Sequence, residues 1–253
     1  MRTRDAAARE LLDEPTHEPE ALRRNLRDIR RINTLLGWRA LTVREIARTV
    51  RASGNRAFTL LDVASGSADM PLAIARWAAR AGIEAHILAT DLNPRIVAIA
   101  REQAAATPSV RVEQQDALAL PYPSGSFDIA LCTLALHHFA PDDAVRLLRE
   151  LARVGRRVLV FDLVRARLAY LGVVALTRAL WMDAMTRHDA PVSVRRGYTV
   201  AEARTLAAHA GLRDAHVRLA VPYRLILTAA GKREPDRASR STEREMRNRL
   251  DTL

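Results

Sequence analysis

Short apolar runs alternate with amphipathic stretches over the central part of the chain. The apolar runs cover residues 57–63, 84–91, 110–116, 128–136 and 157–164, and helical spacing of apolar positions fills about 71–82, 94–106 and 142–153. The runs have the length of buried strands, and the stretches between them have the period of helices that bury one face. Strands that alternate with helices are typical of βαβ units. The pattern therefore predicts an α/β fold with a parallel sheet and helices on both faces.

The segments that flank this core also show helical patterns. In the first 55 residues, Leu22, Leu26 and Ile29 begin an apolar stripe at helical spacing, which predicts a helical extension in front of the sheet. The segment 165–198 opens with an unusually apolar helical stretch and continues into a stretch that Pro191 and Gly197 mark as a loop. Taken alone, this pattern indicates that the segment is core or a dimer surface.

The C-terminal part predicts one more helix and a hairpin. Thr199 and Glu202 have the spacing of a capping box, and Gly211 provides a stop for the helix. Two apolar runs joined through Pro222 and Tyr223 predict an antiparallel pair of strands. The expected organisation is an N-terminal helical cap (1–55), a main domain (56–231) with an insertion at 165–198, and a charged tail (232–253) that is flexible or a short helix.

The turn after the first strand points to a bound ligand. Residues 64–68 are all small and separate the strand from a helix, so the backbone can approach a ligand closely at Gly66. The N-terminus of the helix adds free N–H groups at the same place. Many turns of this kind are rich in glycine only for packing, so the turn is a weak signal by itself.

Acidic residues at the ends of three successive strands strengthen the indication. Asp62, Asp91 and Asp116 would lie along one edge of a parallel sheet, where the second strand of a nucleotide-binding unit presents a carboxylate to ribose hydroxyls. An aspartate at a strand end can also cap the next helix. Three in succession favour a ligand site over three separate caps.

At this point the chain resembles a known family. The stretches DVASGSADM, TDLNPRIVAIAR, DALALPYPSGSFDIAL and LALHHF resemble successive motifs of the class I S-adenosylmethionine-dependent methyltransferases, the broad group that includes the ubiquinone and menaquinone C-methyltransferases. The resemblance implies a Rossmann-like, seven-stranded, mostly parallel sheet with an antiparallel final strand. It also implies S-adenosyl-L-methionine as the cofactor, and it implies that the segment 165–198, inserted after the fifth strand, covers the substrate. The chain departs from the family where Ala64 and Ala68 replace two glycines, and its turn does not match the G-x-G-x-x-G fingerprint of nicotinamide enzymes.

The resemblance also implies which residues bind the cofactor. Asp62 would support the turn and the methionine ammonium, with Ala64 and Gly66 close to the methionine and ribose. Asp91 would accept the ribose hydroxyls, Leu92 would pack on the adenine, and Asp116 and Ala117 would bind its polar edge. An N-terminal helix covers the pocket in many relatives. The methionine carboxylate would therefore fall within reach of one of Arg24, Arg27 and Arg31.

The residues that would handle the acceptor are predicted from strand ends and from the insertion. His138 is the first choice for a general base and His188 the second, because an imidazole that titrates near neutral pH suits the removal of a hydroxyl proton. Asp162, at the end of the fifth strand, is a further catalytic candidate. Each could instead be structural. Residues that could bind the substrate are His137, Arg195, Arg196 and Tyr198.

Composition and charge exclude several other classes. The formal net charge is +11, but the positive residues are almost all dispersed arginines and aromatic residues make up only 4%, which disfavours a nucleic-acid substrate. The single cysteine, Cys132, lies in an apolar run and predicts a small core residue. No apolar signal-peptide core, no run of membrane-spanning length and no His/Cys spacing typical of a metal site occurs, so we expect a cytoplasmic protein without a metal.

The sequence thus predicts a methyltransferase for a small, largely apolar phenolic, quinol or polyketide-type acceptor, with oxygen or carbon as the methylated atom. Specialised metabolism is the expected context, and a homodimer is left open. Two alternatives remain at this stage: an RNA methyltransferase, and a protein of the same fold that binds the cofactor without methylating anything.

Overall fold

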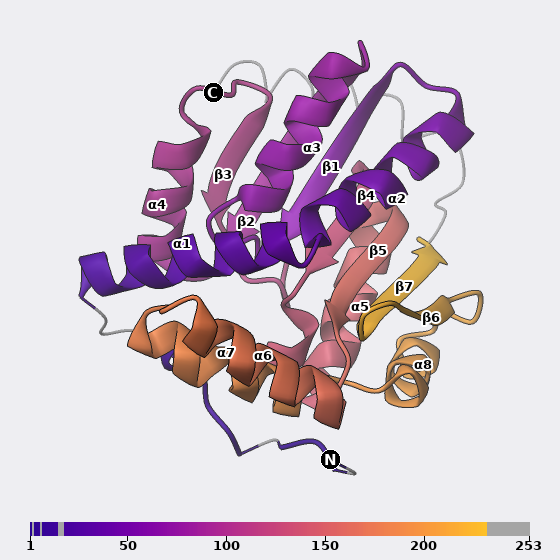
Figure 1. Ribbon diagram of the computed structural model, residues 1–253. Coiled ribbons are helices and arrows are strands. Elements are labelled where there is room, and N and C mark those ends of the chain that lie inside the picture. Colours follow the sequence, from indigo (N-terminus) through magenta and orange to yellow (C-terminus); the bar gives the residue numbers. More distant parts are fainter. Residues whose placement is uncertain (2, 6, 15–17, 232–253) are drawn as a thin grey trace.

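A seven-stranded sheet forms the centre of the molecule (Figure 1). The computed structural model describes residues 1, 3–5, 7–14 and 18–231, so the predicted tail at 232–253 lies outside the described residues. The strand order is β3-β2-β1-β4-β5-β7-β6. The strands are β1 (Ala57–Val63), β2 (Glu84–Asp91), β3 (Val110–Gln114), β4 (Phe127–Thr133), β5 (Gly155–Leu163), β6 (His216–Ala220) and β7 (Arg224–Ala230).

All neighbouring strands are parallel except at β7, which is antiparallel to both β5 and β6. This confirms the predicted mostly parallel sheet with an antiparallel final strand. The chain order reverses between β1 and β4, and in open α/β sheets such a reversal creates a crevice at the carboxyl ends of the strands. The predicted ligand edge therefore coincides with the crevice of the fold.

Helices cover both faces of the sheet (Figure 1). One apolar cluster joins the sheet to α2, α3 and α4, and a second joins its other face to α5 and α8; Cys132 is a fully buried member of the second cluster, as predicted. The bounds are α2 (Trp38–Ser53), α3 (Asp69–Arg80), α4 (Pro94–Ala104), α5 (Pro141–Val154) and α8 (Val200–His209). The three predicted core helices are confirmed within two residues at each end, because each buries a regular apolar stripe.

Three more helices enclose the crevice from outside the sheet. The long helix α1 (Pro19–Leu35) crosses above the strand ends, and α6 (Arg167–Ala179) and α7 (Ala184–Arg196) form a pair opposite it (Figure 1). None of the helices in the described part of the chain is both long and apolar enough to cross a membrane.

The stretch around Pro191, predicted as a loop, is helical. Asp183 caps α7 by accepting a hydrogen bond from the backbone N–H of Met185 at 3.0 Å. Pro191 removes one backbone donor but does not end the helix, because most of the side chains around it are buried against neighbouring elements. Tertiary packing here outweighs the local signals of proline and polar residues.

Candidate active site

A cavity of about 940 Å³ opens at the carboxyl ends of the strands. The turn after β1 and the strand ends of β2 and β3 line one end of it, and the His137–His138 segment, the first residues of the chain and the α6/α7 pair line the other. Helix α1 closes it from above. The cavity therefore has room for two ligands, or two parts of one ligand, placed end to end.

The turn after β1 has an unusual backbone. Ala64, Gly66 and Ala68 all have positive φ, at 51°, 57° and 59°. The two alanines therefore adopt the conformation for which glycine is preferred. A Cβ atom placed on Gly66 would have nothing within 4 Å of it, so the backbone faces open space there.

Three carboxyl groups surround this turn, of which those of Asp62 and Asp69 are buried and that of Asp91 is partly buried. Burial raises the pKa of Asp62 well above its usual value, and repulsion from Asp69 and Asp91 raises it further. Burial also raises the pKa of Asp69 and of Asp91, despite hydrogen bonds that lower them. No hydrogen bond from any described residue reaches Oδ1 of Asp62. Such a group of acids is suited to a ligand that brings positive charge or hydrogen-bond donors.

The remaining predicted cofactor residues lie along the same end of the cavity. Asp91 accepts hydrogen bonds from the backbone N–H groups of Gly66 and Asn93, both at 3.0 Å, and so fixes the turn to the second strand. Leu92 is exposed at the rim, while Asp116 and Ala117 line the wall beyond β3. The structure thus brings together all seven residues that the sequence assigned to the cofactor.

Helix α1 contributes amides to the cavity and directs its arginines elsewhere. Asn33 donates a hydrogen bond to Asp69 at 3.2 Å and lines the cavity, as does Asn25. Arg24, Arg27 and Arg31 do not line it. Their guanidinium groups pair with Asp183, Glu20 and Asp28 instead. The predicted contact with a methionine carboxylate therefore lacks structural support.

At the other end of the cavity, His137 is held firmly. Its ring nitrogen Nδ1 donates to Oδ1 of Asp162 at 2.7 Å, and its backbone N–H donates to Oδ2 of the same carboxylate at 2.8 Å. Both side chains are almost fully buried. This leaves Nε2 of His137 free to face Glu10, whose Oε1 is 3.6 Å away. Asp162 thus positions the imidazole, and it is the imidazole that lines the cavity.

His138 also lines the cavity, between two other carboxylates. Its Nδ1 donates to Asp13 at 3.0 Å and its Nε2 lies 3.7 Å from Glu10. Burial would lower the pKa of His138, but the Coulomb attraction of Glu10 and the hydrogen bond to Asp13 outweigh burial and raise the pKa to about 9. Near neutral pH this imidazole is therefore charged, which does not fit the expectation of a free base poised at that pH.

Glu10 and Asp13 come from the N-terminal segment, which the sequence did not connect with the site. Arg4 anchors this segment by donating to the backbone carbonyls of His137 and Phe139 at 2.8 and 2.9 Å. Asp189 of α7 anchors it again by accepting the backbone N–H groups of residues 11 and 12 at 2.8 and 2.9 Å. No local pattern signals these contacts, because they join residues more than 130 positions apart.

Five residues predicted for catalysis or substrate binding lie outside the cavity lining: Asp162, which positions His137, and four others. His188 is half exposed and pairs with its neighbour Asp189. Arg195 pairs with Asp5, and the hydroxyl of Tyr198 donates to the carbonyl of Phe139. Arg196 is buried and donates to Asp13 and to the carbonyl of His138. These last three side chains hold the N-terminal segment and the His137–His138 segment in place.

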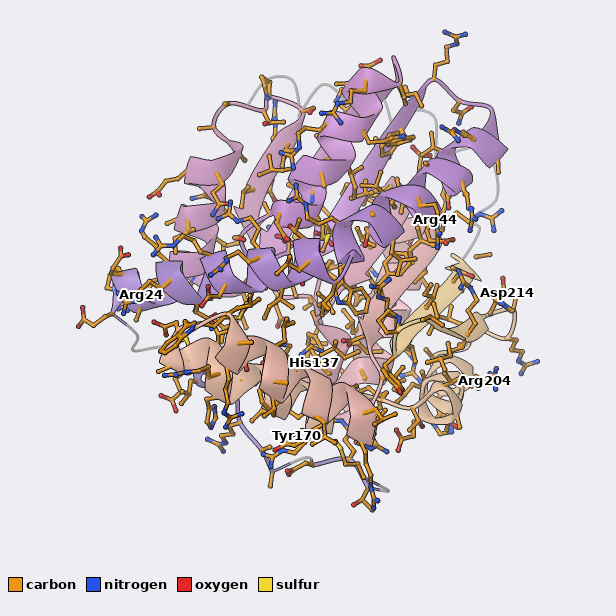
Figure 2. The ribbon with its side chains drawn as sticks, viewed as in Figure 1. Arg24, Arg44, His137, Tyr170, Arg204 and Asp214 are labelled. Atoms are coloured by element: carbon orange, nitrogen blue, oxygen red, sulfur yellow. The ribbon has the colours of Figure 1, made fainter. Side chains whose placement is uncertain are left out.

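The walls between these polar groups are apolar. Helix α6 presents one stripe to the cavity, and helix α1 presents a second one opposite. The α6 stripe consists of Leu168, Ala169, Gly172, Val173 and Leu176, and the α1 stripe of Leu26, Ile29 and Ile32. Figure 2 shows His137 in the interior between these two helices, whereas Arg24 lies near the outer end of α1. An apolar molecule with a polar edge fits this end of the cavity.

A known protein family matches the part of the chain that builds the cofactor end. The family described as a methyltransferase domain matches residues 60–157. A demethylmenaquinone methyltransferase of Deinococcus radiodurans is 34% identical over 129 residues, which are 49% of this chain and 48% of that protein. A ubiquinone/menaquinone biosynthesis C-methyltransferase of Azotobacter vinelandii is 29% identical over 141 residues, 54% of this chain and 52% of that protein. The chain therefore spans about half the length of these curated relatives.

Solved structures share the fold at low sequence identity. Human N-acetylserotonin methyltransferase in complex with S-adenosylmethionine superposes with a TM-score of 0.61 at 17% identity, over 86% of this chain and 57% of that chain. A methyltransferase from Aquifex aeolicus superposes with a TM-score of 0.55 at 16% identity, over 85% of this chain and 98% of that chain. At these identities the likeness establishes the fold.

The cofactor end has the features that S-adenosylmethionine requires. The open space at Gly66 admits a ligand next to the backbone. The Asp62 carboxylate, which no described residue satisfies at Oδ1, is placed to receive a donor, and the buried acids favour a cationic ligand. These features agree with the cofactor that the sequence predicted.

Proposed function

We propose that this chain is a class I S-adenosylmethionine-dependent methyltransferase that methylates a small, largely apolar acceptor of phenolic, quinol or polyketide type. When bound, the cofactor supplies a methyl group on a sulfonium, ready for in-line displacement. The chain's own residues orient the two partners and exclude water from between them.

One observation carries the proposal: a single cavity joins the acidic turn at Asp62, Gly66 and Asp91 to an apolar end with polar groups at His137 and His138. The first part suits the cation and hydroxyls of the cofactor. The second suits a flat apolar molecule with one polar edge, where the two imidazoles face the oxygen that must lose a proton or carry negative charge. An acceptor of this kind agrees with the relatives, which are a demethylmenaquinone methyltransferase and a ubiquinone/menaquinone biosynthesis C-methyltransferase.

The test is methyl transfer with a labelled cofactor over a panel of phenols, naphthoquinols and polyketide-type enols, with total rRNA as a contrasting substrate. We expect transfer to at least one of the small molecules and none to RNA, and NMR of the product then distinguishes O- from C-methylation. Methylation of RNA alone would overturn the proposal. Cofactor binding without transfer to any acceptor would favour a non-methylating protein of the same fold.

The cofactor half can be tested separately by calorimetry with S-adenosylhomocysteine. We expect Asp91→Ala to weaken binding by roughly a hundredfold, because a carboxylate that accepts charge-assisted or buried hydrogen bonds is worth about 1.5–3 kcal/mol. Asp142→Ala is the control, since Asp142 is exposed at the start of α5 and away from the cavity. Equal cofactor affinity in both variants would show that Asp91 does not contribute to cofactor binding.

A further inference from the structure

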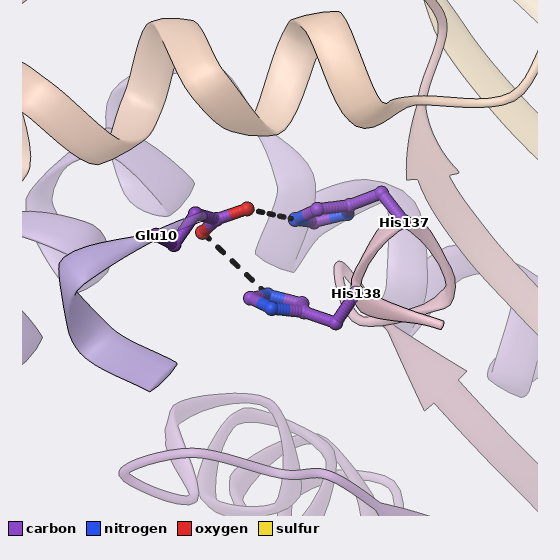
Figure 3. A group of neighbouring side chains, drawn as sticks. All are labelled: Glu10, His137 and His138. Atoms are coloured by element: carbon purple, nitrogen blue, oxygen red, sulfur yellow. Dashed lines mark ion pairs between the residues drawn. The ribbon is translucent and has the colours of Figure 1, made fainter. Parts of the chain in front are cut away.

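A second kind of site lies at the acceptor end of the cavity. Glu10, His137 and His138 each offer one nitrogen or oxygen ligand atom, and the three atoms all lie within 4.8 Å of one another (Figure 3). Nε2 of His137 is 3.6 Å from Oε1 of Glu10, and Nε2 of His138 is 3.7 Å from Oε2. Figure 3 shows both rings directed toward the glutamate.

These separations are close to those of ligands that share one ion. Metal–ligand bonds of about 2.0–2.2 Å place neighbouring ligand atoms about 3.0–3.5 Å apart. A small inward movement of the side chains would therefore complete a set of two imidazoles and one carboxylate. That set suits divalent first-row transition ions, and the two imidazoles disfavour Mg²⁺ and Ca²⁺, which prefer oxygen ligands.

The residues behind the two histidines strengthen this interpretation. Asp162 binds Nδ1 of His137 at 2.7 Å and Asp13 binds Nδ1 of His138 at 3.0 Å. Metal-binding histidines characteristically donate their other ring nitrogen to a carboxylate, which fixes the ring and directs the remaining nitrogen at the ion. Here both histidines have such a partner, and the Nε2 atoms of both rings are directed at the same glutamate.

Glu10 supplies the independent sign of a missing ligand. Its side chain is only 4% exposed, and no described residue donates a hydrogen bond to its buried Oε1. The guanidinium of Arg196 lies 3.7 Å from this oxygen, but it donates its hydrogen bonds to Asp13 and to the carbonyl of His138. Oε1 of Glu10 therefore has positive groups nearby but no hydrogen-bond donor, and a bound ion would supply the direct contact that this buried oxygen lacks.

We propose that Glu10, His137 and His138 bind a divalent transition-metal ion, such as Zn²⁺ or Fe²⁺, with open coordination positions that face the cavity. All three residues line the cavity, so an oxygen atom of the acceptor can reach the ion as a further ligand. This role in acceptor binding rests on the proposed function. The metal site itself rests on the geometry of the three side chains.

The test is metal binding by untagged, chelator-stripped protein, measured by equilibrium dialysis with elemental analysis and by the visible spectrum of added Co²⁺. We expect about one ion of Co²⁺, Zn²⁺ or Fe²⁺ per chain and little Mg²⁺. Glu10→Gln and His138→Ala should each weaken binding at least a hundredfold, and Asp13→Asn by about 10–100-fold, the usual effect of removing a carboxylate that orients a metal-binding histidine.

His86→Ala is the matched control, because His86 also pairs with a carboxylate, that of Glu84 at 2.8 Å, but lies outside the cavity and away from the N-terminal segment. It should leave metal binding unchanged, and thermal unfolding confirms that every variant folds. Absence of stoichiometric binding to the wild-type protein, or binding that survives in the Glu10→Gln/His138→Ala double variant, would overturn the site. Metal binding without methyl transfer would refute only the proposed function, and transfer at full rate without metal binding would refute only the site.

Discussion

At the scale of single residues, the turn after β1 holds two alanines in a glycine conformation. A residue with a Cβ at positive φ destabilises the folded chain by roughly 1–2 kcal/mol. Replacing such an alanine by glycine removes this strain, but the larger backbone freedom of glycine in the unfolded chain offsets about 0.5–1 kcal/mol of the gain. Ala64, at φ 51°, is only partly buried, so little packing is lost when its methyl group is removed.

We therefore expect Ala64→Gly to raise the free energy of unfolding by up to about 1 kcal/mol, and Gly66→Ala to lower it by about 1 kcal/mol. Denaturant unfolding measures both. The exposed helical residue Ala79 is the control, because Ala79→Gly should cost about 1 kcal/mol where the backbone is ordinary helix. A loss of stability in Ala64→Gly as large as in the control would show that the backbone of Ala64 is not strained.

The buried acids of the cofactor end oppose folding in the absence of a ligand. The pKa values of Asp62, Asp69 and Asp91 are raised above their usual values in the folded chain, so the unfolded chain releases their protons at lower pH than the folded one. These groups therefore lower stability above their folded pKa values, and stability is recovered as pH falls through those values.

Asp62→Asn should accordingly stabilise the ligand-free protein at neutral pH by about 1–3 kcal/mol, because the amide cannot carry the buried charge that Asp69 and Asp91 repel, and it should flatten the rise in stability on mild acidification. Cofactor affinity should fall at least tenfold in the same variant. Thermal unfolding between pH 5 and 8, with and without S-adenosylhomocysteine, tests both effects. A variant that is less stable than the wild type at neutral pH would disprove this account of Asp62.

At the scale of elements, α7 connects the lid, our name for the helical pair α6 and α7, to the N-terminal segment. Asp189 is buried and accepts two backbone hydrogen bonds that place the short helix η1 (Leu11–Asp13) beside the two histidines. Asp189→Ala should therefore release Glu10 and Asp13 from the cavity. We expect a loss of about 2 kcal/mol in stability, from two charge-assisted hydrogen bonds, and faster hydrogen exchange over residues 7–14.

Cofactor affinity should change little in Asp189→Ala, because the turn after β1 lies at the other end of the cavity. A loss of cofactor affinity as large as the loss expected for Asp91→Ala would show that the two ends are not independent. Hydrogen exchange that stays slow over residues 7–14 would show that other contacts, such as those of Arg4, suffice to hold the segment.

The elements also show how far the sequence can predict the structure. Local periodicity correctly predicts strands β1 and β2 and the helices between the core strands. Helix α7 does not follow from it, since Pro191 and the polar residues around it are local loop signals. This segment is helical because it is buried against α1, α6, η1 and a second short 3₁₀ helix, η2 (Leu136–His138), and these contacts join residues too far apart in the sequence for a local pattern to show them.

At the scale of the whole molecule, the two ends of the cavity differ in how far the sequence predicts them. The cofactor end is built from consecutive βα turns, so the spacing of Asp62, Asp91 and Asp116 was enough to predict it. The acceptor end is built from residue 10, residues 137–138 and residue 162, which only the completed fold brings together. This is why the sequence identified His137, His138 and Asp162 but not their partners Glu10 and Asp13.

The lid formed by α6 and α7 begins and ends at the same place. Val164, at its start, forms a β-bridge with Tyr198, at its end, and the buried Arg165 donates to the carbonyl of Gly197 at 2.7 Å and to Glu202 at 2.7 and 3.0 Å. Arg165→Ala should lower stability by about 2 kcal/mol and speed hydrogen exchange in both lid helices, with the sheet unaffected. Exchange that is faster in the sheet as well would mean that the lid and the sheet unfold together.

A helical segment whose two ends are joined in this way can be replaced as a unit by a different segment. Because Val164 and Tyr198 lie side by side, the two ends of the segment between them are fixed together, and a longer, shorter or differently lined helical pair can be accommodated there without a change in strand order or in the cofactor turn. Under the proposed function, acceptor choice can then diverge, in evolution and in the laboratory, by replacement of residues 165–198 alone, while the turn and strand ends that bind the methyl donor stay unchanged.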